Sequence, residues 1–422
     1  MTEPASPLQI ADYRRYWLAR FIAVFATMAM VVLIGYQLYD VARADYGMSV
    51  AEASFQLGLL GLAQFIPLFV LTPVAGLAAD RFDRRYVAAF ANGIDGVVAA
   101  LLAVLTWADA LNIPIIFALA AAHGAARVFV NPAMSAIAPN IVPANLLPRA
   151  IALSSIAWQT ASVAGPAVGG LIFARSEWMP HAISAGMLVA AMMLVLTIRP
   201  IKARHDGPPL KPLRQIIEGL AYVWRERFLL GCITLDLFAV LLAGATALLP
   251  VFARDILFVG PEGLGLMRAA PALGAAIVAL WLSFRPLESA VGMKMLWAVA
   301  AFGAFTIAFA FSRNFLLSLA ILAAMGAVDM VSVFIRSSLV QLFTPDDKRG
   351  RVSSISGLAI SASNELGEMQ SGLAAALLGV TGAVVFGGAG AIFVTLIWAW
   401  YFPELRRANS FEPQELKREV ST

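Results

Sequence analysis

The chain repeats itself at a fixed offset of 202 positions, and the repeat runs through long apolar segments. No gap is needed between the first matched pair and the last. A repeat of this length and register predicts two copies of one structural unit, fused in tandem. The matched pairs are Ser135 and Ser337, Pro143 and Pro345, Arg149 and Arg351, Ser154 and Ser356, Gly165 and Gly367, Gly170 and Gly372, and Leu171 and Leu373.

The apolar segments have the length that a lipid bilayer requires. Hydrophobic residues make up 60% of the chain and charged residues 13%, which is far from the balance of soluble proteins. Stretches of about twenty apolar residues span the hydrocarbon core as helices. We therefore expect an all-α integral membrane protein with twelve transmembrane helices in two pseudo-symmetric six-helix bundles. The expected spans are 17–40, 55–79, 86–107, 113–138, 151–174, 180–198, 228–253, 263–284, 292–311, 315–343, 353–378 and 383–402.

The repeat also suggests the kind of protein. Parallel repeats of membrane helices are typical of secondary transporters, whose substrate sites lie near mid-membrane between the repeats. The expected domains are an N-terminal bundle (1–198), a cytoplasmic linker (199–227), a C-terminal bundle (228–402) and a cytoplasmic tail (403–422).

The linker ends in a segment with helical spacing of apolar residues. Basic residues flank this pattern, so we expect an amphipathic helix on the membrane surface. A partner-binding helix of the calmodulin-target type is the alternative. The apolar positions are Leu213, Ile216, Ile217, Leu220 and Val223.

Orientation follows from the distribution of Lys and Arg. With both termini in the cytoplasm, the inner segments hold 22 of these residues and the outer segments hold four. This bias matches the positive-inside rule. The net charge of +4 needs no nucleic-acid partner, because the basic residues lie where the phosphates of the inner leaflet would be.

Several chemistries are not expected. The single Cys232 supplies neither a disulfide nor a set of metal ligands. We find no G-x-x-x-x-G-K-[ST] loop for ATP and no soluble domain large enough for a catalytic triad. From the single cysteine, the lack of an ATP loop and the lack of a large soluble domain, we expect no enzyme activity, no cofactor and no metal. Separately, no segment has the pattern of a cleaved signal peptide.

The loop after the second span carries a family signature. Its sequence, G-L-A-A-D-R-F-D-R-R, resembles the loop signature of the major facilitator superfamily, which implies that superfamily's fold and alternating-access transport. In the superfamily this loop is a latch that closes the cytoplasmic side. Asp83 stands where the family has a second glycine, which puts the turn geometry in question. The alternative is a plain positive-inside loop. The cytoplasmic latch would comprise Gly76, Asp80, Arg81, Arg84 and Arg85.

A second resemblance lies in the fifth span. Gly165, Pro166, Gly169 and Gly170 are similar to the superfamily's antiporter motif, in which small residues permit close packing and proline bends the helix. We name these residues the helix-bend motif; simple helix packing is the alternative. The stretches 129–150 and 345–352 resemble the transmembrane secretion effector branch, which includes siderophore exporters.

Charged residues inside the spans are candidate functional residues, since each is costly in lipid unless it faces protein or water. The offset of 202 pairs Arg127 with Asp329, and it places two acids where the first half has Val163 and Pro166. The C-terminal half has thus acquired acids of its own. The candidates for proton coupling are Asp329, Glu365 and Glu368, followed by Asp236 and Asp95.

Helix rise places the three leading acids at one depth. Asp329 lies about 21 Å from the end of its span, and Glu365 and Glu368 lie about 18 and 23 Å from the start of theirs. Neighbouring carboxyls at low dielectric cannot all stay ionised, so one can carry a proton. The alternative is a buried structural network with Arg336.

The remaining intramembrane polar residues are candidates for the substrate cavity. His123 and Arg127 share a face of the fourth span, and Arg127 could contact a carboxylate or catecholate. The full set is Arg127, Asn131, His123, Gln37 and Arg336.

The sequence therefore predicts a proton-coupled exporter of a small amphipathic molecule, siderophore or drug-like, in a bacterial inner membrane. Its expected partners are that substrate, protons and the lipid bilayer, and we expect a monomer. A lipid or lysophospholipid flippase of the same fold is one alternative. A non-transporting membrane partner protein is the other, although a scaffold has no use for mid-membrane charges.

Overall fold

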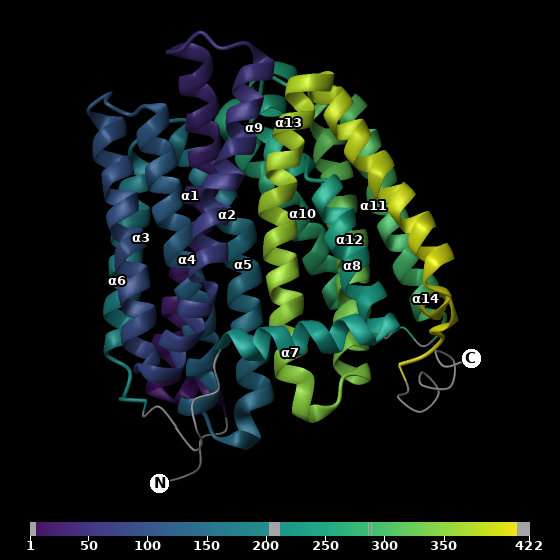
Figure 1. Ribbon diagram of the computed structural model, residues 1–422. Helices are drawn as coiled ribbons and strands as arrows, with labels where there is room; N and C mark the ends of the chain where they lie inside the picture. The colour runs from purple at the N-terminus through teal and green to yellow at the C-terminus, as the bar shows by residue number, and fades with distance from the viewer. Residues whose placement is uncertain (1–5, 202–211, 286, 288, 412–422) are drawn as a thin grey trace. The chain divides into compact units, whose positions relative to one another are not determined.

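The computed structural model describes residues 6–201, 212–285, 287 and 289–411, and these residues form helices and connecting loops without a strand. The expected all-α class is confirmed. Figure 1 shows the helices with their labels. They are α1 (Ala11–Ala44), α2 (Val50–Arg81), α3 (Arg84–Trp107), α4 (Ile113–Ile141), α5 (Leu147–Phe173), α6 (Met179–Leu196), α7 (Pro212–Arg225), α8 (Arg227–Leu242), α9 (Leu249–Val251), α10 (Gly260–Phe284), α11 (Val291–Phe311), α12 (Phe315–Phe343), α13 (Asp346–Tyr401) and α14 (Pro403–Arg407).

Eleven helical segments of the described chain are long and apolar enough to cross a membrane. The last of them, Arg351–Tyr401, has 51 residues, or about 77 Å of helix, against about 30 Å of hydrocarbon. Gly379 breaks it with φ 74° and ψ 165°, a left-handed conformation that favours glycine. Figure 1 shows α13 turning back on itself, so it supplies the eleventh and twelfth expected spans.

The seventh expected span, 228–253, is not one continuous helix. Helix α8 ends at Leu242, and after a short 3₁₀ turn (Ala245–Leu248) the chain continues through α9 into a π-helical turn (Phe252–Ile256). Gly244 and Pro250 lie in this region, and both disfavour a straight helix. The break leaves the last carbonyls of α8 without the helical partners that a longer helix would give them.

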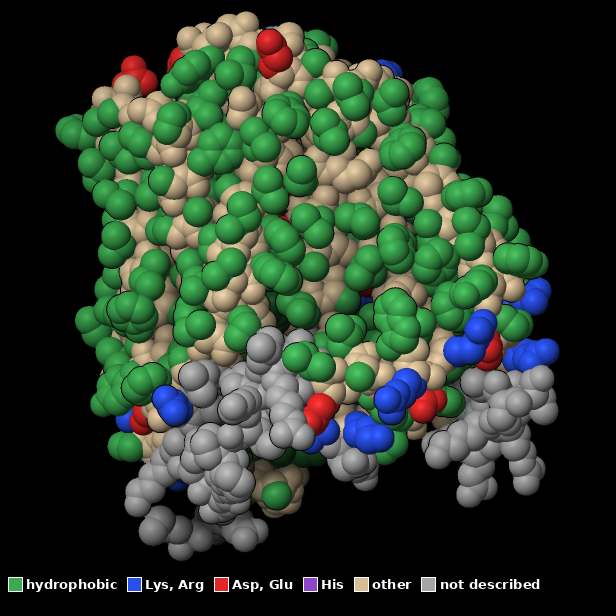
Figure 2. Space-filling model, in the orientation of Figure 1, with side chains coloured by type: hydrophobic (Ala, Val, Ile, Leu, Met, Phe, Trp, Pro, Cys, Tyr) green, Lys and Arg blue, Asp and Glu red, His purple; other side chains and the backbone are tan. Residues whose placement is uncertain are grey.

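The outward faces of the spans are apolar. Phe90, Trp107 and Trp400 are more than 70% exposed, which suits contact with lipid and would be unfavourable in water. Figure 2 shows apolar side chains over most of this face, with the charged ones gathered near the ends of the helices. Such a banded surface is that of a multi-pass membrane protein.

The described chain divides into two compact units. The first comprises 1–47, 63–209 and 259–269, and the second comprises 48–62, 210–258 and 270–422. The first half of α2 therefore packs with the second unit, and the start of α10 packs with the first. The predicted domain limits of 1–198 and 228–402 follow the repeat instead, and they stay a prediction.

In the first unit, α1 packs against α5 and α6, and α3 packs against α4 and α6. The Tyr13 hydroxyl donates to the carbonyl of Ala150 (2.6 Å), and the Trp17 indole donates to the carbonyl of Leu153 (2.9 Å), so both bonds tie α1 to α5. Buried polar groups in lipid need such partners, and each bond fixes the register of the two helices.

In the second unit, α13 packs against α8 and α11, and α11 packs against α12. Aromatic pairs fill its core: the rings of Phe228 and Phe343 lie 4.8 Å apart, and those of Phe252 and Phe309 lie 4.5 Å apart. Helix α7 packs against α13 and α8. The predicted amphipathic helix is present, with Val223 buried and Ile217 and Leu220 exposed, while the side chains of Leu213 and Ile216 lie outside the described residues.

Candidate functional site

The two C-terminal acids lie where three helical segments of the second unit meet. Glu365 is buried and Glu368 is half-buried. A Cβ placed on Gly61 of α2 would lie 2.8 Å from the Glu365 carbonyl oxygen and 3.3 Å from Oε2 of Glu368. The absence of a side chain at Gly61 is thus what allows α2 to lie against these acids. Helix α13 is continuous here, so Glu368 lies one helical turn beyond Glu365, and their shared depth in the membrane stays a prediction.

The break after α8 lies on another side of the same segment. A Cβ on Gly367 would lie 2.9 Å from the Val240 carbonyl and 3.3 Å from the Leu241 carbonyl, and a Cβ on Gly244 would lie 2.5 Å from the Gly367 carbonyl. Carbonyl ends of interrupted helices are favourable surroundings for cations and unfavourable ones for a carboxylate. Glu368 follows Gly367 directly and Glu365 precedes it by two residues, so both acids belong to the segment of α13 that packs against this break.

Asp329 of α12 is half-buried, and its predicted depth stays a prediction. In the described part of the chain its carboxyl has neither a hydrogen bond nor an ion pair within the protein. Both features suit a carboxyl that exchanges protons. Among the described residues Asp329 forms no hydrogen bond or ion pair with Glu365 or Glu368, and the three-acid group stays a prediction.

Arg336 and Asp236 form a buried ion pair between α12 and α8. The sequence predicts Arg336 for the substrate cavity and Asp236 for proton coupling, and it does not predict that they pair. A buried pair of this kind is costly to break from one side, because the remaining charge has no partner. These two residues therefore hold α8 to α12.

In the first unit, Asp95 of α3 and His123 of α4 are paired. Their atoms Oδ1 and Nδ1 lie 2.9 Å apart, and both side chains are no more than 2% exposed. The other ring nitrogen of His123 and the amide nitrogen of Asn92 are buried without a hydrogen-bond partner. Arg127, one turn from His123, is half-buried, and Asn131 is exposed.

Gln37 joins a second buried group rather than an open cavity. Its amide nitrogen donates to the Thr106 hydroxyl (2.9 Å), and its amide oxygen lies 2.8 Å from Nε2 of His181. These bonds connect α1, α3 and α6. The sequence offered no signal for this group, since His181 stands at the start of a span with no polar periodicity around it.

An acidic residue stands beside this group, between α5 and α6. Partial burial raises the pKa of Glu177 above its usual range, and the negative charges of Asp40 and Asp109 raise it further. Three acids thus meet at the end of the first unit where α1 and α3 finish.

The latch loop shows what Asp83 does in place of glycine. Helix α2 ends at Arg81 and α3 begins at Arg84, and Asp83, with φ −59°, caps α3 by accepting from the Arg85 backbone N–H (3.0 Å). The Arg85 guanidinium holds both carboxylate oxygens, at 2.7 to 3.1 Å. Burial favours protonation of Asp83, but its hydrogen bonds and the charge of Arg85 outweigh that effect and lower its pKa. No positive φ is needed, so glycine is not required.

The other latch residues are dispersed. Arg84 donates to the Ala136 carbonyl (3.2 Å), Arg81 is exposed, and Gly76 has open space where a Cβ would be. The side chain of Asp80 lies outside the described residues. The latch role of these residues stays a prediction.

The helix-bend motif makes three close contacts within the first unit, two with α1 and one with α10. A Cβ on Gly165 would lie 2.6 Å from the Phe25 carbonyl of α1, and one on Gly169 would lie 2.9 Å from Cβ of Ala29. On the other side, a Cβ on Gly170 would lie 2.4 Å from the Pro261 carbonyl, at the start of α10. These are the close contacts that small residues permit between helices, and a role of the motif in transport stays a prediction.

The repeat partner of Gly170 makes the same kind of contact in the second unit. A Cβ on Gly372 would lie 2.5 Å from Cα of Gly58, in the first half of α2. Sequence alone could not identify either partner helix, because helix neighbours are set by tertiary packing.

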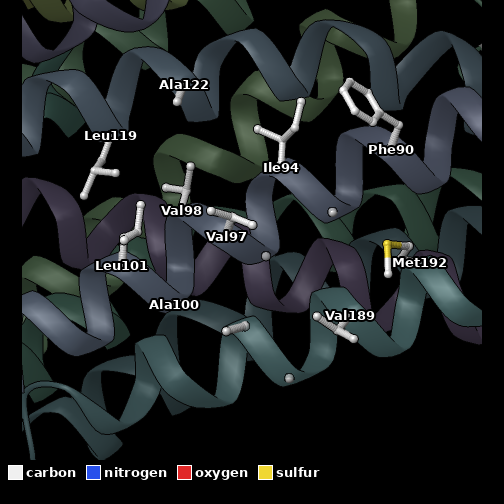
Figure 3. Close-up of a pocket in the computed structure, with 14 residues that line it drawn as sticks. Phe90, Ile94, Val97, Val98, Ala100, Leu101, Leu119, Ala122, Val189 and Met192 are labelled. Carbon is white, nitrogen blue, oxygen red and sulfur yellow. The ribbon is translucent and has the colours of Figure 1, made fainter.

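An apolar groove opens on the first unit between α3, α4 and α6, with a volume of about 860 Å³. Figure 3 shows its lining, in which Phe90, Ile94 and Val97 of α3 stand near Leu119 and Ala122 of α4 and Val189 and Met192 of α6. Its lining carries almost no polar surface, and Gly186 leaves open space on its α6 side. Such a groove can accept an acyl chain but offers a headgroup nothing to bind.

Comparison with known proteins identifies the family of this chain and its relatives. The family described as transmembrane secretion effector matches residues 2–420. The chain is 26% identical to enterobactin exporters of Escherichia coli O1:K1 and Shigella boydii serotype 18 over 413 residues, covering 95% of this chain and 94% of the relatives.

Solved structures with this fold include a bacterial homologue of the iron transporter ferroportin in an inward-facing state, with a TM-score of 0.70, 15% identity, and coverage of 92% of this chain and 98% of that one. A D-xylose–proton symporter gives a TM-score of 0.67 and 14% identity, with coverage of 92% and 96%. At these identities the likeness concerns the fold, which is that of major facilitator transporters.

Proposed function

Because this chain belongs to the transmembrane secretion effector family of major facilitator transporters, we propose that it exports a small amphipathic molecule of the siderophore kind in exchange for protons. The chain is a multi-pass membrane transporter and not an enzyme. The substrate class rests on the relatives that are named enterobactin exporters. A bacterial inner membrane with both termini in the cytoplasm is the location we propose, on the relatives and on the Lys and Arg bias.

The observation that carries the proposal is the position of Glu365 and Glu368. They stand on a segment of α13 that packs against the first half of α2 on one side and, at Gly367, against the interrupted end of α8 on another. A proton arriving at either acid removes a negative charge from this packed segment, and so changes the stability of its packing. This links proton binding to helix movement, which is what coupled transport requires.

The cycle we propose is the movement of the two six-helix repeats about a central substrate site. When the site faces outward and the substrate has left, Asp329, Glu365 or Glu368 takes a proton from outside. When the site faces inward, the proton leaves and substrate loads. Arg127, at the depth equivalent to Asp329, would contact a carboxylate or catecholate of the substrate.

The test uses full-length protein reconstituted in liposomes, with enterobactin as the transported compound and an imposed pH difference. Asp329→Asn, Glu365→Gln and Glu368→Gln are compared with wild type, and the exposed Glu262→Gln is the matched control. For the proton carrier we expect loss of uphill accumulation with exchange of labelled for unlabelled substrate retained, because exchange needs no net proton movement.

Two results would contradict the proposal. If all three variants accumulate substrate in proportion to the pH difference, as Glu262→Gln should, the proton pathway lies elsewhere and Asp236 or Asp95 is next. If every variant merely folds poorly, with coupling intact in the protein that survives, the acids form a structural network.

One observation favours the lipid flippase as a second candidate. The apolar groove is lined by residues of three predicted spans, α3, α4 and α6 of the first unit. A flippase also needs a polar route for the headgroup, which this lining does not provide. Transport of fluorescent lysophospholipid in the same liposomes, without transport of enterobactin, would favour the flippase.

A further inference from the structure

We propose that the pocket between α7 and the start of α13 binds the phosphate headgroup of an anionic phospholipid, whose acyl chains lie along the exposed face of α7. The pocket has a volume of about 340 Å³, within the range of small-molecule sites. Its lining includes Glu218, Tyr222 and Arg225 of α7 with Lys348 and Arg351 of α13. All of these residues belong to the second unit.

The charge of the pocket selects an anion. The named lining residues carry three positive charges and one negative charge. Arg351 forms an ion pair with Glu218 at 3.3 Å, and the ammonium of Lys348 stands 4.2 Å from the centre of the Tyr222 ring. The carboxylate and the ring therefore hold the two cations in place, and an arriving phosphate oxygen meets fixed donors.

The pocket forms where α7 and α13 pack closely against each other. Gly219 lets α7 lie close to α13, since a Cβ there would come within 3.2 Å of Cβ of Arg351 and of a side-chain carbon of Ile355. Val223, one turn further along this face, is buried. The two helices are thus packed together, and this packing fixes the positions of the backbone segments that carry the basic residues of the pocket.

The other face of α7 points away from the protein and is apolar. Ile217, Leu220 and Trp224 follow one another at helical spacing and are 57%, 51% and 70% exposed. An apolar stripe of this kind, with a tryptophan, is typical of a helix that lies in the membrane interface. Figure 2 shows Lys and Arg side chains together with acidic ones along the margin of the surface beneath α7.

The level of the pocket agrees with a lipid rather than a free anion. The membrane-spanning segment of α13 begins at Arg351, and the span that contains α8 begins at Arg227, directly after α7. Because both apolar segments begin beside the pocket, we expect it at the height where hydrocarbon ends and headgroups begin. This is the side of the membrane on which most Lys and Arg residues are predicted to lie. One lipid can fill the pocket with its phosphate and cover the stripe with its chains.

The experiment uses the delipidated full-length protein in detergent and native mass spectrometry with dioleoyl-phosphatidylglycerol, dioleoyl-phosphatidylcholine or inorganic phosphate. We expect phosphatidylglycerol to bind at least tenfold more tightly than phosphatidylcholine. Lys348→Gln with Arg351→Gln should remove that preference. Arg349→Gln is the matched control, because it removes an exposed charge of the same helix that does not line the pocket, and it should leave binding unchanged.

Two further variants separate the parts of the proposal. Lys348→Gln alone leaves the Arg351–Glu218 pair intact, so it should fold normally and still weaken phosphatidylglycerol several-fold. Ile217→Ser with Leu220→Ser changes no charge and should weaken the lipid while leaving phosphate unaffected. Equal binding of the two lipids by wild type, equal loss in Arg349→Gln, or phosphate binding as tight as phosphatidylglycerol would each overturn the proposal.

Discussion

The close contact between Gly372 of α13 and Gly58 of α2 predicts the effect of adding one side chain. A Cβ on Gly372 would lie 2.5 Å from both Cα and N of Gly58 and 2.7 Å from the Ser54 carbonyl. Non-bonded carbon atoms prefer about 3.5 to 4.0 Å, so α2 and α13 must separate by about 1 Å to accept Gly372→Ala. They must separate further for Gly372→Leu.

Two opposing free-energy terms act on the stability of the Gly372→Ala variant. Overpacking typically costs about 1–3 kcal/mol, whereas replacing glycine by alanine in a helix gains about 1 kcal/mol. The alanine variant should therefore lose about 0–2 kcal/mol of stability, and the leucine variant should disfavour the packed arrangement more strongly. A shift of about 1–3 kcal/mol in a conformational equilibrium corresponds to about 5–150-fold.

The assay measures opening of this crossing directly. Ser54 is fully buried beside Gly372, and the native Cys232 is also buried, so a Ser54→Cys reporter in a Cys232→Ala background gives a clean thiol signal. We expect Gly372→Leu to raise labelling of this thiol by a water-soluble maleimide at least fivefold and to lower uphill transport.

The matched control lies on the same helix. Gly357 has nothing within 4 Å of its Cβ position, so Gly357→Leu should change neither labelling nor transport. If the Ser54→Cys thiol stays protected in Gly372→Leu while transport is normal, the crossing tolerates a side chain and the steric reasoning is wrong.

Three other predictions concern charged residues. Asp80→Asn should slow transport with substrate affinity nearly unchanged, because the latch sets the balance between conformations; strongly weakened equilibrium binding with normal interconversion would contradict this. Glu177→Gln should raise the melting temperature at neutral pH by about 1 °C, because a raised carboxyl pKa makes the ionised form destabilising; the gain should vanish as pH falls through about 4.5, and melting curves across pH test it. Asp236→Asn should cost about 3–5 kcal/mol of stability by leaving Arg336 unpaired, whereas Asp236→Leu with Arg336→Met should be far milder in thermal unfolding.

The spans could be predicted because bilayer thickness fixes their length. The interval expected between the last two spans, 379–382, begins at Gly379, the residue where α13 breaks. The interruption near Gly244 was missed, although Gly244 and Pro250 were visible, because average hydropathy does not respond to a local break in hydrogen bonding. The depths of the charged residues follow from helix rise, and they stay a prediction.

Lateral neighbours could not be predicted in the same way. Asp95 and His123 are both mid-span polar residues, and nothing along the chain says that α3 and α4 present them to each other at 2.9 Å. The same holds for Asp236 and Arg336. Pairing depends on the rotation of each helix about its axis, which is set by packing of apolar side chains that many sequences could provide.

The helix contacts at equivalent positions of the two repeats can be compared directly. Gly170 and Gly372 occupy equivalent positions, and each lies against the beginning of another span, near Pro261 in one case and at Gly58 in the other. One turn earlier the equivalent residues differ: the Pro166 carbonyl meets Gly265 of α10, and the Glu368 side chain meets Gly61 of α2. The duplication has kept the close crossing and replaced a residue that only shapes the helix with one that can ionise. A proton on Glu368 would thus change the charge at a helix crossing itself, where a small electrostatic difference acts directly on whether the two helices stay together.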